Sequence, residues 1–459
     1  MKYLLLLTTW LYMVSAAAQI FPTETLIDHG SIEKRINILI LGDGYLSTEL
    51  DKFEDDAQHV IDKLLVEPPY EEYANFFNAV IVKVPSNESG TDHPADATDV
   101  VEPVFPQGVK DTYFNSTFDG AHIHRLVITG STATAYSVAA QNFPSYDQIL
   151  MIVNSPEYGG SGGTIATFST HSSSAEVGIH EMGHSFAKLA DEYWAGEQYA
   201  AEKPNMTANN DQNSVKWKNW LNTNNIGIYP YGTSGVPAQW FRPHQSCKMR
   251  QLGVPFCSVC KEQTIDRIYQ LVTPIDEYSP ASIFQNYTGG TLDFSLDLVL
   301  PEPNTLKIEW DLDGAIVATN VSSLSLDNSV LPSGESTLTV MVTDTTLLSQ
   351  KYATGYVFSE SWEITNSTVA LIEADARLFY KVYPNPTSDI LYVEFDGDFP
   401  AKDTEIQLVN PSGKIIFYEK KQLTQKARLE FNTANFPKGN YFLKIKRGNV
   451  RQSVPIALE

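Results

Sequence analysis

The segment from residue 171 to residue 193 constrains this chain more than any other part of its sequence. It reads HSSSAEVGIHEMGHSFAKLADEY. Ser173 and Glu176 have the spacing of a capping box, which predicts that a helix starts there. On that helix His180 and His184 lie one turn apart on the same face, so their imidazoles can bind one zinc ion together.

Glu181 lies next to the first of these histidines. A water bound to zinc has a pKa near 7, so a carboxylate beside it can take its proton and later pass that proton to a leaving amine. The alternative is a helix with two exposed histidines. The longer motif around the histidines favours hydrolysis through a Glu-activated zinc-bound water, with one catalytic Zn²⁺ as cofactor.

The third zinc ligand is less clear from the sequence, and Asp191 is the first choice. On a continued helix Asp191 would share the face of the histidines but lie roughly 10 Å beyond His184. It can coordinate only if the helix stops and the chain turns back, yet Ala187 stands where a glycine would permit that turn. Glu192 is a second local option, and Glu262 on a later helix is a third.

Two further segments fit a zinc peptidase. Gly160, Gly162 and Gly163 lie in a glycine-rich stretch that can pair with an extended substrate backbone, although a plain glycine loop is the alternative. Tyr193 is a candidate to assist the reaction. Met249 stands in a segment similar to the turn that packs beneath the metal in metzincins, and a simple core methionine is the alternative.

The three cysteines are Cys247, Cys257 and Cys260. The last two have the spacing of half a zinc ribbon or of a redox pair, but the other half of a ribbon is missing. An exported chain can oxidise two of the three thiols. We therefore predict a structural disulfide, for which Cys247 with Cys257 is one pairing.

The N-terminus has the parts of a secretory signal peptide, residues 1–18. Lys2 precedes a short apolar run, and Ala16-Ala17-Ala18 forms a cleavage site. The apolar run is shorter than the roughly 20 residues of a membrane span, and no later run is long enough, so we expect no transmembrane segment. The net charge of −23 argues against a nucleic-acid partner, since phosphate binding needs a basic surface.

Changes in the pattern of apolar residues along the chain predict three domains after the signal peptide, of which the first two are described here and the third below. Residues 19–272 alternate apolar strands (36–42, 77–84, 125–129, 148–154) with helices (48–64, 133–141), which indicates an α/β or α+β catalytic domain. Residues 273–375 contain short alternating strands typical of an immunoglobulin-like β-sandwich.

Asp311-Leu-Asp-Gly314 has the spacing of part of a calcium loop, but the distal Glu is absent. We predict a hairpin turn there, and structural Ca²⁺ has no other support.

Residues 33–270 resemble the bacterial IgA-peptidase family of zinc metallopeptidases. The matching stretches include Asn37-Ile-Leu-Ile-Leu-Gly-Asp-Gly-Tyr45, Val84-Pro-Ser-Asn-Glu-Ser-Gly-Thr-Asp92, residues 180–193, and Cys247-Lys-Met-Arg through Cys260. The resemblance implies a zincin-like fold, a metzincin-like zinc site and Glu181 as general base. It does not carry the identity of the substrate.

Residues 376–459 resemble the C-terminal sorting domain of type IX secretion cargo. The matching residues are Val382-Tyr-Pro-Asn-Pro386, Gly413-Lys and Pro437-Lys-Gly-Asn-Tyr441, and the segment from residue 380 holds 12 basic and 9 acidic residues in an otherwise acidic chain. The resemblance implies a small β-sandwich, recognition by the type IX machinery, and release or attachment at the surface of a Gram-negative cell after passage through the periplasm.

The sequence therefore predicts a secreted zinc endopeptidase that acts on a protein or peptide. Two alternatives stay open at this point. One is a non-catalytic surface adhesin or glycan-binding protein with a vestigial zinc site, against which the intact Glu181 speaks. The other is a zinc amidase that acts on cell-wall peptides.

Overall fold

The computed structural model describes residues 20–101, 107–351, 355–367, 380–395, 402–411, 413–423, 427–447 and 450–459. The expected signal peptide, residues 1–18, lies outside the described residues. The chain forms two compact units. The first comprises Met1–Glu277, Leu296–Ile308 and Met341–Phe358, and the second comprises Tyr278–Ser295, Glu309–Val340 and Ser359–Glu459.

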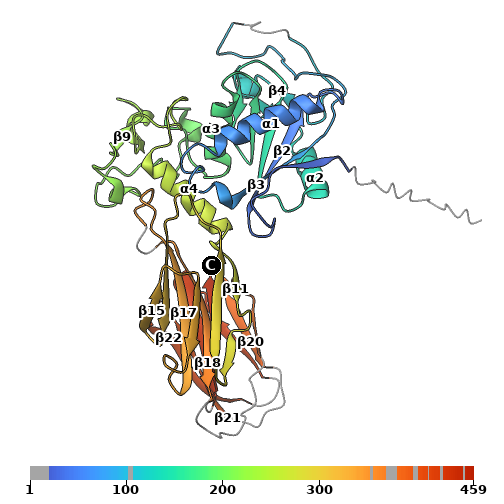
Figure 1. The fold of residues 1–459 in the computed structure, drawn as a ribbon. Coiled ribbons are helices and arrows are strands. Elements are labelled where there is room, and N and C mark those ends of the chain that lie inside the picture. Colours follow the sequence, from blue (N-terminus) through green and yellow to red (C-terminus); the bar gives the residue numbers. More distant parts are fainter. Residues whose placement is uncertain are drawn as a thin grey trace, which may run out of the picture. The chain divides into compact units, whose positions relative to one another are not determined.

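The first unit contains a six-stranded sheet in the order β1-β3-β2-β6-β8-β7 (Figure 1). Its four inner strands run parallel, and the two edge strands run antiparallel to their neighbours. Every residue of the inner strands is buried, as expected of a parallel sheet covered on both faces. The strands are β1 (Thr23–Ile27), β2 (Ile36–Asp43), β3 (Phe77–Val82), β6 (Gln148–Val153), β7 (Gly160–Ser161) and β8 (Ile165–Ser169).

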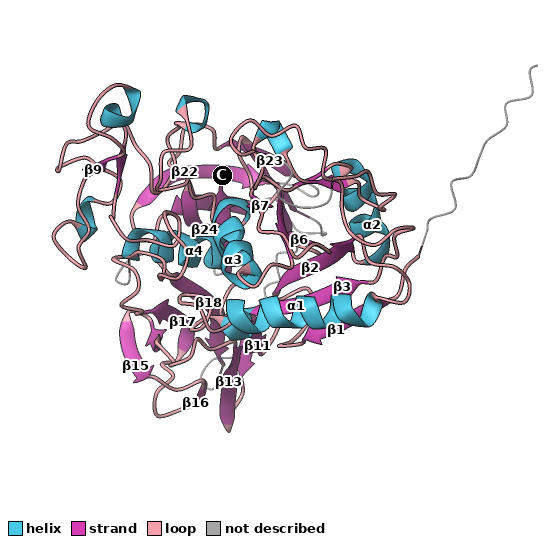
Figure 2. Ribbon diagram, turned by 90° about the horizontal axis from the view of Figure 1, so that it is seen from above, coloured by secondary structure: helices cyan, strands magenta, loops and turns pink. Residues whose placement is uncertain are grey.

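Helices cover both faces of this sheet. Because side chains alternate along a strand, Ile38 and Ile40 of β2 enter one hydrophobic core, and Leu39 and Leu41 enter another. The first core holds residues of α1 (Leu50–Leu64), α3 (Ser174–Ser185) and α4 (Ser258–Leu271), and the second holds residues of α2 (Thr132–Asn142). Figure 2 shows α1 and α2 on opposite sides of the sheet.

Shorter elements connect these layers. The strand expected over residues 125–129 is reduced to the two residues of β5, because this segment belongs to a small separate sheet with β4. The short elements are β4 (Ser116–Thr117), β5 (Ile128–Thr129), β9 (Tyr229–Pro230), β10 (Phe241–Arg242), and the 3₁₀ turns η1 (Ala74–Phe76), η2 (Gly120–His122), η3 (Glu197–Tyr199), η4 (Lys218–Trp220) and η5 (Val236–Gln239).

Residues 275–366 form two further sheets, with orders β11-β13-β16 and β12-β18-β17-β14-β15. Trp310 stacks on Trp362, and Phe294 packs edge-on against Trp362, so aromatic rings fill this core. Asp313 and Gly314 both have positive φ between β14 and β15, which confirms the predicted hairpin turn. The strands are β11 (Ile275–Ser279), β12 (Phe284–Tyr287), β13 (Thr291–Leu298), β14 (Leu306–Leu312), β15 (Ala315–Thr319), β16 (Ser323–Asp327), β17 (Gly334–Asp344) and β18 (Val357–Asn366).

The C-terminal segment forms two sheets, with orders β19-β20-β23 and β22-β21-β24-β25, around one core that includes Val393, Ile406 and Ile445. The strands are β19 (Tyr380–Tyr383), β20 (Ile390–Phe395), β21 (Lys402–Val409), β22 (Ile415–Leu423), β23 (Arg428–Asn432), β24 (Gly439–Arg447) and β25 (Val450–Leu458).

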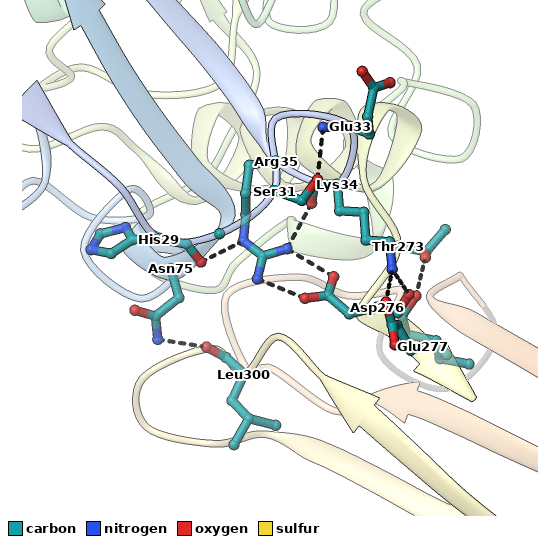
Figure 3. A network of polar contacts seen from close by, with 12 residues as sticks. His29, Ser31, Glu33, Lys34, Arg35, Asn75, Thr273, Asp276, Glu277 and Leu300 are labelled. Atoms are coloured by element: carbon teal, nitrogen blue, oxygen red, sulfur yellow. Dashed lines mark hydrogen bonds and ion pairs between the residues drawn. The ribbon is translucent and has the colours of Figure 1, made fainter. Parts of the chain in front are cut away.

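A buried ion pair ties the beginning of β2 to β11 within the first unit (Figure 3). The guanidinium of Arg35 donates to both carboxylate oxygens of Asp276, at 2.8 and 2.7 Å. Two further N–H groups of Arg35, one on Nε and one on Nη1, donate to the carbonyls of His29 and Lys34. The two side chains are only 7% and 16% exposed. This bidentate geometry is the kind in which removal of one partner is costly.

We expect Arg35→Met to lower the free energy of unfolding of the first unit by about 3 kcal/mol, because it leaves the Asp276 carboxylate without its partner. The neighbouring pair of Lys34 and Glu277 is exposed, so Lys34→Met serves as the control and should cost less than about 1 kcal/mol. Urea unfolding measures both values. Equal losses in the two variants would contradict this account of the pair.

Candidate active site

Helix α3 carries the two histidines and the glutamate that the sequence singled out. It begins after Ser173, as predicted, but the capping box does not form, because the Ser173 side chain makes no capping hydrogen bond. The Glu176 carboxylate instead accepts hydrogen bonds from Lys248 Nζ at 2.6 Å and from the Gly253 amide at 3.0 Å. The start of α3 is thus held by the segment that follows residue 246.

The chain turns back immediately after α3. Lys188 adopts φ = +60°, and the amide of Leu189 donates to the carbonyl of Gly183 at 2.9 Å. This hydrogen bond closes a loop of seven residues, one more than in a Schellman helix end, and the left-handed position within it is one that glycine usually occupies. Lys188 is exposed, so its side chain needs no space in the core, and the turn forms without a glycine.

The turn brings Asp191 to the two histidines. Its Oδ1 atom lies 3.1 Å from His180 Nε2 and 3.2 Å from His184 Nε2. Three ligands at about 2.0–2.1 Å from a tetrahedral zinc ion would lie about 3.3 Å apart, so the observed spacing fits that ion. His180, His184 and Asp191 thus form one of the groups of described residues that can hold a metal.

Backbone carbonyls fix both imidazoles. His180 Nδ1 contacts the carbonyl of Lys248 and His184 Nδ1 contacts that of Leu189, each at 2.9 Å. Such bonds orient the ring and leave Nε2 free for a metal. Burial tends to lower the pKa of His184, but hydrogen bonding and the charge of Asp191 outweigh it and raise that pKa to about 9. The space between His180, His184 and Asp191 therefore favours a positive charge.

The segment with Asp191 is held on two sides. The side-chain oxygen of Asn205 accepts a hydrogen bond from the Ala190 amide at 2.7 Å. Its side-chain nitrogen donates one to the Ala190 carbonyl at 2.8 Å. The Glu192 amide donates to the carbonyl of Met249 at 2.6 Å. Asn205 could not be predicted from the sequence, since a single asparagine in a loop carries no pattern. These contacts explain how a loop residue keeps a fixed place beside the helix.

Glu181 is 7% exposed and faces β7. A Cβ atom built on Gly160 would lie 3.3 Å from Glu181 Oε1, and one on Gly162 would lie 2.6 Å from His184. The glycines therefore let the edge of the sheet lie directly against the histidine helix. Burial raises the pKa of the Glu181 carboxyl, although the two neighbouring imidazoles act in the opposite direction.

Tyr193 lies beside the group formed by His180, His184 and Asp191. The positively charged side chain of Arg125 lies next to its ring, which the sequence did not indicate. The guanidinium of Arg125 lies 5.5 Å from the centre of the Tyr193 ring. Burial, followed by the charge of Asp191, raises the pKa of the Tyr193 phenol, whereas Arg125 lowers it. The phenol therefore keeps its proton at neutral pH and can donate a hydrogen bond.

Met249 lies beneath α3. It is fully buried, and a Cβ atom on Gly183 would lie 2.4 Å from its sulfur. The carbonyl of Cys247 accepts hydrogen bonds from the amides of Arg250 and Gln251, so the chain makes a tight turn around Met249. Met249 therefore packs against the helix that carries both histidines, and its role as a methionine below a metal stays a prediction.

The other candidate ligands lie elsewhere. Glu262 Oε2 accepts hydrogen bonds from Trp220, Ser349 and the Gln350 amide, at 3.0, 3.0 and 2.6 Å. Glu192 points away from the histidines, with Oε1 at 3.2 Å from Cys260 Sγ. Neither belongs to the histidine group.

The predicted disulfide is wrong. Cys247, Cys257 and Cys260 are all free thiols. The sulfur of Cys260 lies 3.7 Å from that of Cys247 and 3.6 Å from that of Cys257. These separations are far above the roughly 2.05 Å of a sulfur–sulfur bond. The three thiols instead surround the Glu192 carboxylate.

Another buried group of histidines escaped the sequence analysis. His124 contacts Glu157 at 2.6 Å and Asp119 at 3.2 Å, and His93 lies 3.6 Å from each of the same carboxylates. His93, His124 and Glu157 could also hold a metal ion. Their long separation in the sequence left no motif to find. The two carboxylates already pair with both histidines, which accounts for the burial of all four.

The first unit is built around a helix that carries two histidines and a glutamate. This arrangement is the one expected of a metallopeptidase. Comparison with family models agrees. Residues 25–236 match the model described as IgA Peptidase M64, and residues 381–457 match the Secretion system C-terminal sorting domain. The chain therefore carries a peptidase domain of the M64 family, whose members are metallopeptidases, followed by a sorting domain. Both resemblances seen in the sequence are confirmed.

Comparison with curated proteins gave no match. Solved structures with similarity include fibronectin(III)-like modules of Clostridium thermocellum CbhA (10% identity, TM-score 0.15, 40% of this chain and 93% of that one). Dimeric latent PorU from Porphyromonas gingivalis has 10% identity and a TM-score of 0.17, with 48% of this chain and 22% of that one covered. Bacteroides ovatus SGBP-B, in complex with a mixed-linkage heptasaccharide, has 14% identity and a TM-score of 0.17, with 40% and 47% covered. At these TM-scores the matches do not establish a shared fold.

The sorting domain indicates secretion across the outer membrane by the type IX route of Bacteroidetes. Within the described part of the chain, no helix is both long enough and apolar enough to cross a bilayer.

The left-handed turn at Lys188 gives a first test of this geometry. We expect Lys188→Gly to raise the free energy of unfolding by up to about 1 kcal/mol, because glycine adopts positive φ without a steric cost. Lys188→Val should lower it by about 1–2 kcal/mol and weaken zinc binding, since β-branched residues resist this conformation. Thermal unfolding and zinc titration measure both effects. A stabilising valine or a destabilising glycine would refute the role of the turn.

The close approach of β7 to α3 gives a second test. Gly162→Ala places a methyl group against His184, so we expect at least a tenfold loss of zinc affinity with the secondary structure retained. Gly163→Ala is the matched control, because the nearest atom to its Cβ is a carbonyl oxygen at 3.9 Å. Competition with a chelating dye measures the affinity. Equal affinities in the two variants would count against this packing.

Proposed function

We propose that this protein is a secreted zinc-dependent endopeptidase with Glu181 as general base. The observation that carries the proposal is the convergence of three donor atoms, from His180, His184 and Asp191, on one point beside a buried carboxylate. Two imidazoles and one carboxylate form a donor set that suits Zn²⁺ and leaves one position for water or substrate.

The three ligand residues would hold the ion, and a bound Zn²⁺ would supply a Lewis acid that acidifies water and polarises a carbonyl. The remaining chemistry belongs to the chain. A Glu181 oxygen takes a proton from the attacking water and returns it to the nitrogen of the leaving amine. The buried position of Glu181 keeps bulk water from competing for that proton.

The substrate would lie along the continuation of β7. The Gly160 amide already donates to the carbonyl of Arg125 at 3.0 Å, so this part of the edge is occupied. Gly162, Gly163 and Thr164 are exposed directly after it. An extended peptide can pair with such an edge through main-chain hydrogen bonds, which favours cleavage within a chain. Tyr193 and Arg125 are candidates to contact the same substrate.

We expect Glu181→Gln to reduce cleavage of an unfolded protein by a factor of about 10²–10⁴ or more, because the amide cannot accept the proton. Zinc content should stay unchanged, since Glu181 is not a ligand. The control is Glu197→Gln, an exposed change in the following loop, which should cleave like the wild type. Mass spectrometry of fragments and elemental analysis give the two readouts.

Equal digestion by the wild type and Glu181→Gln would end the proposal. A wild type that retains zinc but cleaves no protein would favour a binding protein with a vestigial site. Release of peptides from cell walls, without digestion of unfolded protein, would favour the amidase. Each result excludes the endopeptidase in a different way.

A further inference from the structure

Three thiols and one carboxylate meet below the active site, and nothing in the proposed reaction uses them. We call this group the thiol cluster; it consists of Cys247, Cys257, Cys260 and Glu192. One donor atom from each lies within 4.8 Å of all the others. Each residue is at most 6% exposed.

The spacing of the thiol cluster fits a tetrahedral zinc ion. Thiolates at about 2.3 Å from zinc lie about 3.7–3.8 Å apart, and a thiolate and a carboxylate oxygen lie about 3.5 Å apart. Cys260 Sγ lies 3.7 Å from Cys247 Sγ and 3.6 Å from Cys257 Sγ, and the sulfurs of Cys247 and Cys257 lie within 4.8 Å of each other. The distances from Glu192 Oε1 to the sulfurs of Cys257 and Cys260 are 3.8 and 3.2 Å. Their mean agrees with the roughly 3.5 Å expected between a thiolate and a carboxylate oxygen on one zinc ion.

Local backbone structure places partial positive charge beside two of these sulfurs. Cys257 is the N-cap of α4, and Cys260 lies in the first turn of that helix. The N-terminus of a helix stabilises negative charge on nearby sulfur. The Cys257 amide also donates to the sulfur of Cys247 at 3.3 Å.

A disulfide explains the thiol cluster less well. A single sulfur–sulfur bond would use only two of the four grouped donors and would leave the third thiol and the buried Glu192 side chain unexplained. Glu192 Oε2 is buried without a hydrogen-bond partner, although Oε1 accepts one from Asn205 at 3.2 Å. A redox role also requires access for a partner thiol, and Cys260 is 0% exposed.

We propose that the thiol cluster binds a second, structural Zn²⁺. Four protein ligands without a position for water are the mark of structural rather than catalytic zinc. A sulfur-rich tetrahedral site also selects zinc over magnesium and calcium, which prefer oxygen ligands. The proposal does not depend on the endopeptidase activity, because none of its ligands takes part in the reaction.

The second ion would join the two segments that shape the active site. Glu192 directly follows Asp191, and its amide is bonded to the carbonyl of Met249. Cys247 stands one residue before Lys248, whose carbonyl orients His180. Loss of the structural ion should therefore loosen both the third ligand and the first histidine. We expect it to weaken binding of the catalytic ion as well.

Elemental analysis of the full chain, purified after export, tests the stoichiometry. We expect two zinc ions per wild-type chain and one in His184→Ala, which loses only the catalytic ion. With cobalt in place of zinc, His184→Ala should show sulfur-to-cobalt charge-transfer absorption. This absorption should be absent from Cys260→Ser, provided that variant folds. No metal in His184→Ala, or bound cobalt without the sulfur-to-cobalt absorption, would overturn the proposal.

Thiol titration of the wild type needs no variant. We expect the native protein to be unreactive and the denatured protein with a chelator to show three thiols per chain. A single reactive thiol would mean that two cysteines had formed a disulfide, and the structural zinc site would be refuted. Three thiols that react fully in the native protein would refute it too, since ligands to a buried ion are protected.

Discussion

The left-handed turn after α3 is the constraint on which the rest of the site depends. A helix alone can bring two histidines to one face, but it carries the next carboxylate about 10 Å away. The hydrogen bond from the Leu189 amide to the Gly183 carbonyl closes the helix and returns the chain to the histidines. Asp191 then lies 3.1 and 3.2 Å from their Nε2 atoms.

The surrounding fold keeps this turn in place. The parallel sheet supplies a rigid support, because its inner strands are fully buried and helices cover both faces. Met249 fills the space beneath Gly183, and β7 lies against the other side of the helix through its glycines. Asn205 and the Met249 carbonyl hold the segment that contains Asp191. The site is therefore made by packing around one short helix.

Much of this arrangement could be predicted from the sequence. The apolar runs of β2, β3 and β6, the periodicity of α1 and the motif on α3 all express local rules. The turn could not be predicted, because lysine rarely adopts positive φ and no glycine marks the position. The capping box does not form, and Glu176 instead pairs with Lys248, a residue 72 positions away that no local pattern could indicate.

The cysteines show a different limit. Their number and the signal peptide suggested oxidation, yet all three are free in the structure. Only the fold reveals that they share one centre with Glu192, since that residue lies more than fifty positions earlier in the chain. Spacing within a sequence indicates which ligands are local. It does not show which distant group completes a site.

The most direct test of the central claim is a crystal structure of the zinc-loaded protein with anomalous diffraction measured at the zinc edge. The geometry requires a peak within about 2.0–2.2 Å of His180 Nε2, His184 Nε2 and a carboxylate oxygen of Asp191. A peak held by the two histidines and another carboxylate, with Asp191 turned away, would contradict the account.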